Sequence, residues 1–197
     1  SLKRLGERAL RFSEEWFGDE APHMQAVLLK VFELDPGDEA IFDRLTVGLT
    51  TQGEWVKLLD LYTRAVGATD SLERQTRLLN EAVRVARELA NDDDRAIAFM
   101  KRLLLLRPGD AALRVQLERL LEKNQRYREL IALRDSAAQT LPEREANQVK
   151  VQIAQLWLSK LRNPTAALEV LRKVLEVDPG ESTALVALES ILDSEEA

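Results

Sequence analysis

The chain has 197 residues, of which 45% are hydrophobic and only 5% aromatic, and its 28 basic and 34 acidic side chains give a net charge of −6. This acidic balance argues against nucleic-acid binding, which needs a basic surface. The absence of cysteine excludes disulfides, thiol catalysis and zinc–thiolate sites in any compartment, and no apolar run reaches the ~18 residues of a membrane-spanning helix.

Three similar tetrapeptides divide the chain: Asp35-Pro36-Gly37-Asp38, Arg107-Pro108-Gly109-Asp110 and Asp178-Pro179-Gly180-Glu181. Their prolines are 72 and 71 residues apart. A fixed period of this kind is typical of stacked repeats, in which each unit buries its apolar face on the next. We therefore predict one repeat domain over residues 1–197, with joints near 35–38, 107–110 and 178–181, and interpret the chain as a piece of a longer array.

Each full period predicts four helices. In the first period, Asp38 is a plausible N-cap, and apolar residues follow at the spacing of one helix face, at Ile41, Phe42, Leu45 and Leu49. Turn residues then separate further helices, and proline ends the last one because it lacks the amide donor. Over the whole chain the pattern predicts eleven helices, near 2–17, 21–34, 38–51, 54–66, 70–90, 94–106, 110–123, 125–139, 142–161, 164–177 and 181–194.

The periods also match position by position. Leu45 corresponds to Leu117 and Leu188, and Leu58 corresponds to Leu130. Later in the unit the matched pairs are Ala96 with Ala167, Met100 with Leu171, and Leu103 with Val174. These positions are the predicted core.

Four helices in 72 residues make two helix–turn–helix units, and this resembles the tetratricopeptide repeat, whose unit of ~34 residues carries a small residue, a large one and a terminal proline. Ala96, Met100 and Pro108 have that spacing, and Ala167, Leu171 and Pro179 repeat it. Alternate units diverge, since Leu58 stands in the place of the small residue. The resemblance implies an all-α, right-handed solenoid of antiparallel helix pairs, in which the first helix of each pair lines a concave face.

No motif points to chemistry. His23 is the only histidine, and a metal or catalytic site would need partners at ligand spacing. The run Asp92-Asp93-Asp94 lacks the alternating ligands and glycine of a calcium loop, so a helix cap explains it better. We expect no catalytic residue, no metal and no cofactor.

The polar faces of the first helices are the candidate binding surface, because amides and guanidinium groups can hydrogen-bond an extended backbone or a carboxylate. The family's carboxylate clamp has no matching pattern here. The candidate residues are Asp43, Val47 and Thr50 on the first such helix, Arg77, Glu81 and Arg84 on the second, Arg119 and Glu122 on the third, and Gln148, Gln152 and Gln155 on the fourth.

These features favour a non-enzymatic scaffold that binds a protein or peptide partner, as a helix or an extended segment, in the concave groove. Two alternatives stay open. The chain could be a structural self-assembly module, which exposed apolar residues after position 181 would favour, or a regulatory region of a larger enzyme or complex. We expect neither nucleic acid nor direct membrane insertion.

Overall fold

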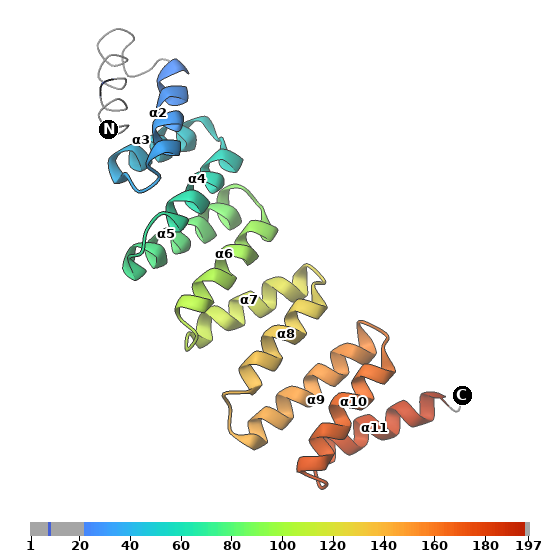
Figure 1. Cartoon of the computed structure of the whole chain (residues 1–197). Helices are drawn as coiled ribbons and strands as arrows, with labels where there is room; N and C mark the ends of the chain where they lie inside the picture. Colours follow the sequence, from blue (N-terminus) through green and yellow to red (C-terminus); the bar gives the residue numbers. More distant parts are fainter. Residues whose placement is uncertain (1–7, 9–21, 196–197) are drawn as a thin grey trace. The chain divides into compact units, whose positions relative to one another are not determined.

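The computed structural model describes Arg8 and residues 22–195, and every regular element in this part of the chain is helical (Figure 1). The α-helices are α2 (Pro22–Leu34), α3 (Glu39–Gln52), α4 (Trp55–Gly67), α5 (Leu72–Arg84), α6 (Asp93–Leu106), α7 (Ala111–Lys123), α8 (Tyr127–Ala138), α9 (Glu143–Ser159), α10 (Pro164–Val177) and α11 (Ser182–Glu195). The predicted all-α class is confirmed. The helix predicted over residues 2–17 lies outside the described residues apart from Arg8.

The chain forms two compact units, Ser1–Leu117 and Glu118–Ala197, with the boundary inside α7. In the first unit, α2 packs on α3, α3 on α4, α4 on α5 and α5 on α6. In the second unit, α8 packs on α9, α9 on α10 and α10 on α11, and α9 also contacts α11. Consecutive helices joined by short turns are antiparallel neighbours, so each unit is a stack of helix pairs, as the sequence predicts.

The matched positions of the repeat form the core of both units. Met100 and Leu171 are completely buried, and so are the small residues Ala96 and Ala167, which let the paired helices approach closely. In the second unit, Leu171 belongs to a cluster that joins α9, α10 and α11. Removing such side chains from water is the main stabilising contribution to each helix pair.

The three predicted joints have the same backbone geometry. The amide of Asp38 donates to the carbonyl of Asp35 at 3.2 Å, and Glu181 donates to Asp178 at 3.2 Å. At the middle joint, the amide of Asp110 donates to the carbonyl of Arg107 at 3.0 Å. Because this bond turns the chain within four residues, each joint ends one helix and begins the next.

The helix predicted over residues 70–90 differs from the prediction at its end. After α5, residues Val85–Leu89 form a π-helical turn, in which the amide of Ala90 donates to the carbonyl of Val85 at 2.9 Å. A π turn accommodates one extra residue per turn. The wider turn therefore absorbs the extra length that separates this helix from a regular repeat.

Candidate functional site

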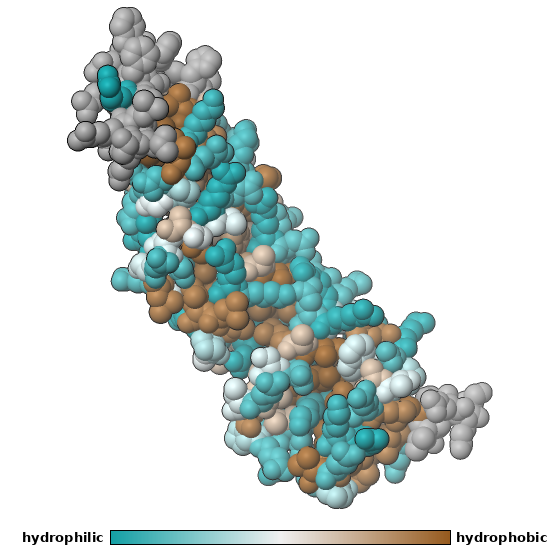
Figure 2. All heavy atoms as spheres, viewed as in Figure 1, coloured by the Kyte–Doolittle hydropathy of each residue, from teal (hydrophilic) through white to brown (hydrophobic). Residues whose placement is uncertain are grey.

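The predicted binding residues lie on the first helix of each pair, and those on α3 and α7 are all exposed. They are Asp43, Val47 and Thr50 on α3, and Arg119 and Glu122 on α7. Their spacing of three or four residues places them on one face of each helix. Over the face seen in Figure 2, polar side chains predominate and apolar ones form smaller patches between them.

The α5 residues are not equivalent to one another. Arg77 and Arg84 are exposed, whereas Glu81 is half-buried and its Oε2 accepts a hydrogen bond from the hydroxyl of Tyr62 on α4 at 3.2 Å. The ring of Tyr62 packs edge-to-face on Phe42, 5.3 Å away between centroids. Burial, and then the charge of Glu81, raise the pKa of Tyr62 above its ordinary value of 10.0. Tyr62 therefore stays protonated and ties Glu81 into the α4–α5 contact.

The α9 residues have a different setting. Gln148, Gln152 and Gln155 are exposed along one face of α9, and this helix packs beside α11. Gln148 and Gln155 each line one of two adjoining pockets, and Gln152 lies between them in the sequence. The structure thus places two of the three predicted amides of α9, Gln148 and Gln155, at pockets, and Gln152 lines neither.

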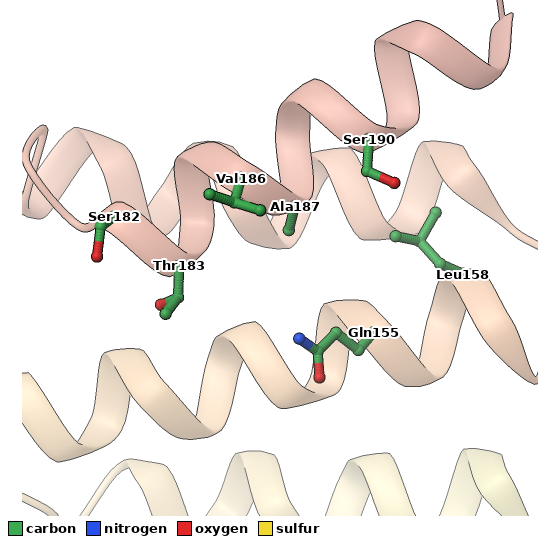
Figure 3. Close-up of a pocket in the computed structure, with 7 residues that line it drawn as sticks. All are labelled: Gln155, Leu158, Ser182, Thr183, Val186, Ala187 and Ser190. Atoms are coloured by element: carbon green, nitrogen blue, oxygen red, sulfur yellow. The ribbon is translucent and has the colours of Figure 1, made fainter.

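The first of these pockets, here called the apolar pocket, lies between α9 and α11 and has a volume of about 430 Å³. Figure 3 shows side chains of the two helices facing one another across it. Leu158, Val186 and Ala187 supply its apolar surface, and Val186 is 64% exposed. The remaining lining residues are Gln155, Ser182, Thr183 and Ser190. The pocket therefore offers an apolar surface bordered by hydrogen-bonding groups.

The second pocket, here called the polar pocket, lies where α9 begins and the turn from α10 enters α11, and its volume is about 620 Å³. Its lining residues are Glu143, Arg144, Asn147, Gln148, Asp178, Gly180, Glu181, Ser182 and Thr183. Ser182 and Thr183 line both pockets, so the two adjoin; together they are here called the α9–α11 groove.

Asn147 is the one buried polar residue among those described. It is 2% exposed, and its side-chain Oδ1 has no hydrogen-bond partner. A buried acceptor without a donor destabilises a fold by about 1–3 kcal/mol. Asn147 also lines the polar pocket.

Sequence reasoning missed the α11 side of this groove, although the repeat contains the signal. A shift of 71 residues takes Val115 to Val186 and Arg119 to Ser190, and both of these α11 residues line the apolar pocket. Of the two candidate residues on α7, Arg119 therefore has a counterpart in the lining of the apolar pocket. Asn147 gave no comparable signal, because its burial depends on how α9 packs.

The described residues hold no group of three or more histidine, cysteine, aspartate or glutamate side chains that could bind a metal. Asp92, in the acidic run, caps α6 by accepting a hydrogen bond from the amide of Arg95 at 2.9 Å, as the sequence predicts. The side chain of His23 lies outside the described part of the structure.

No helix within the described residues combines the length and apolar character needed to cross a membrane.

No family model matches the chain, and no curated protein matches it. Among solved structures, the chain is similar to YrrB, a tetratricopeptide repeat protein with an unusual peptide-binding site, with 17% identity over 92% of this chain and 98% of that one and a TM-score of 0.37. It is also similar to the tetratricopeptide repeat domain of P58(IPK), with 16% identity over 98% of this chain and 56% of that one and a TM-score of 0.42.

A third structure is a thermophilic tetratricopeptide repeat protein of Thermus thermophilus, TTC0263, with 18% identity over 97% of both chains and a TM-score of 0.36. The solved structures named here are thus tetratricopeptide repeat proteins, the family that the sequence resembles. The helix contacts and the hydrogen bonds at the turns make each unit a stack of helix pairs.

Proposed function

We propose that this chain is a non-enzymatic scaffold for protein–protein interaction, and that it holds a partner helix or extended segment against the first helices of its pairs. The observation that carries this proposal is the α9–α11 groove, in which an apolar pocket adjoins a polar one. Grooves that bind peptides commonly combine apolar pockets for side chains with polar groups for the backbone.

The groove has the parts that an extended segment requires. Gln148 and Gln155 each carry both a donor and an acceptor, which matches the N–H and C=O groups of a peptide backbone. Leu158 packs against the buried core of the second unit, so this part of the groove rests on an ordered support. A preformed receptor surface lowers the ordering cost of binding.

The test is a selection from a random library of peptides of about twelve residues, long enough to extend along the groove. We expect the intact chain to enrich a defined group of peptides and Val186→Glu to weaken their binding about tenfold, because a carboxylate would enter the apolar pocket. Val56→Glu is the matched control, since Val56 is 60% exposed on α4 and lines neither pocket. Equal loss in both variants, or no enrichment, would contradict the proposal.

Two further variants test the wider set of candidate residues. Gln152→Glu alters the exposed face of α9, and Arg84→Glu alters that of α5. Weaker peptide binding in the first variant alone would restrict the site to the second unit. Peptide binding that neither variant changes would remove both faces from the proposed site.

Self-assembly is a second candidate, and it has its own supporting observation. Leu185 and Val186 on α11 are 40% and 64% exposed, the apolar exposure beyond position 181 that self-association would use. Sedimentation over a range of concentrations would detect it. A mass that rises with concentration in the intact chain and stays constant in Val186→Glu would favour this candidate over peptide binding.

A further inference from the structure

We infer that the polar pocket binds a basic side chain, lysine or arginine, of the segment held in the groove. This inference rests on the proposed function and adds the chemistry of the partner. It follows from the charges of the pocket, from the unpartnered amide of Asn147, and from the distance between the two pockets.

The charges that line the polar pocket are mainly negative. Glu143, Asp178 and Glu181 contribute three carboxylates, and Arg144 contributes one guanidinium, so the formal sum is −2. Asp178 accepts a hydrogen bond from the amide of Gly180, and Glu181 accepts one from the hydroxyl of Thr183. A carboxylate that accepts one such bond still has several lone pairs, and these favour a ligand that donates several hydrogen bonds.

Asn147 supplies the independent observation. Asn147 lines this same pocket, and its Oδ1 is buried without a donor. An ammonium group offers three N–H donors and a guanidinium group five, whereas a carboxylate ligand offers none. A basic side chain in the pocket would neutralise its carboxylates, and a rotation of the Asn147 side chain toward the pocket would let the same group supply the donor that Oδ1 lacks.

Two helix N-termini oppose this preference, but more weakly. The first turns of α9 and α11 both line the pocket, and each N-terminus carries about half a positive charge. Together they offset about one of the two net negative charges. The pocket therefore stays negative.

The distance between the pockets defines a motif. Gln148 in the polar pocket and Gln155 in the apolar pocket are seven residues apart on α9, and at 1.5 Å per residue this corresponds to roughly 10 Å. An extended peptide advances about 3.3 Å per residue. The basic residue and the apolar residue that fills the second pocket should therefore be two to four positions apart.

The experiment uses a random library of synthetic peptides, acetylated and amidated so that no terminal charge competes. We expect the peptides enriched by the intact chain to carry lysine or arginine two to four positions from an apolar residue. Replacing that basic residue by norleucine should weaken binding about fivefold to tenfold, the range of a partly exposed charge pair with added hydrogen bonds.

Three variants of the chain identify the pocket. Glu143→Gln and Asn147→Leu should each reduce the difference between the basic peptide and its norleucine form to about twofold or less. Glu189→Gln is the matched control, because Glu189 is exposed on α11 and lines neither pocket. Asn147→Leu should leave the chain folded, since it removes an unpartnered buried acceptor.

The outcomes separate the inference from the proposed function. Enriched peptides without a basic residue, or unchanged binding of the norleucine form, would overturn the inference and leave the proposed groove standing. A second library would carry free N-termini. If the chain enriched peptides of this library that lack a basic side chain, the pocket would bind a terminal amine, and the inference would be overturned as well. If no peptide is enriched, the proposed function fails and the inference fails with it.

Discussion

The helix pairs α5–α6 and α9–α10 begin 71 residues apart and have the same backbone geometry at the turn between their helices, yet they present different surfaces. In both, a residue with positive φ precedes the second helix, Asn91 at 50° and Arg162 at 49°. In both, the next residue caps that helix: Asp92 accepts from the amide of Arg95 at 2.9 Å, and Asn163 accepts from that of Ala166 at 3.0 Å. The fold repeats even where the residues differ.

The two pairs also differ in the residue at one equivalent position of the preceding helix, which bonds to the following helix in the first unit and to the preceding helix in the second. In the first unit, Tyr62 extends forward from α4 to Glu81 on α5. In the second unit, the residue at the equivalent place is Arg134, whose Nε donates back to Glu118 on α7 at 2.9 Å. The equivalent of Glu81 is Gln152, which stays exposed on α9. Tyr62 and Arg134 thus bond to different neighbouring helices, and only the first helix that follows Tyr62 has its carboxylate held by this bond.

Truncating core side chains should cost the most stability, and it tests whether the cores of the two pairs contribute equally to the free energy of unfolding. Met100→Ala and Leu171→Ala each remove a completely buried side chain at matched positions. We expect each substitution to lower the free energy of unfolding by about 2–5 kcal/mol, from lost burial and the cavity left behind. Urea unfolding followed by the helical circular dichroism signal measures both.

Leu105→Ala is the control for this comparison, because Leu105 is 81% exposed on α6 and should change stability by about 0.5 kcal/mol or less. Losses in the two core variants that differ by more than about 2 kcal/mol would show that one pair carries more of the stability. The two pairs would then be equivalent in backbone geometry but not in stability.

The second effect tests the contact that distinguishes the first unit. Tyr62→Phe removes the hydrogen bond to Glu81 and keeps the ring against Phe42. We expect a loss of about 1.5–3 kcal/mol in the free energy of unfolding, the range for a hydrogen bond to a charged group. An unchanged stability would mean that the Tyr62–Glu81 hydrogen bond adds nothing to the free energy of unfolding. In that case α5, which carries Glu81, and α9, which carries Gln152, would not differ in this respect.

The same variant has a pH signature. The pKa of Tyr62 is raised in the folded chain above its ordinary value of 10.0, so the folded state retains a proton that the unfolded state releases. The resulting stability is fully present below pH 10 and is lost as the pH rises above it. Between about pH 10 and pH 12, the intact chain should therefore lose stability more steeply than Tyr62→Phe. Parallel slopes would contradict this account.

Much of the fold could be predicted from the sequence because the signals are local and repeated. Proline fixes the joints, an aspartate cap such as Asp38 marks a helix start, and the spacing of Leu45 and Leu49 marks a buried face. The π turn at Val85–Leu89 could not be predicted, since it depends on how the chain absorbs an extra residue within a packed helix.

Less of the candidate site could be predicted. The spacing on α9 identified Gln148 and Gln155, because helical periodicity alone places them on an exposed face. It could not distinguish Glu81 from Gln152, whose settings depend on Tyr62 and Arg134 from another helix. Nor could it identify Asn147, whose burial arises from packing between elements.

The turn that contains Gly53 in the first unit and Gln125 in the second allows a milder test, of the backbone alone. Gly53 and Gln125 occupy the same turn of the repeat, 72 residues apart, with φ of 70° and 56°. This region of φ is strained for a residue with a Cβ, by roughly 1 kcal/mol. A Cβ at Gly53 would lie 3.9 Å from the ring of Trp55, an ordinary contact, so Gly53→Ala reports on backbone strain alone.

We therefore expect Gly53→Ala to lower the free energy of unfolding by about 1 kcal/mol, and Gln125→Gly to raise it by up to about 1 kcal/mol. The gain from glycine is the smaller of the two, because glycine also increases the entropy of the unfolded chain. Urea unfolding of both variants measures the pair of effects. Opposite signs would show that the turn geometry is imposed by the packed helices in both units, since Gln125 adopts it against its own preference.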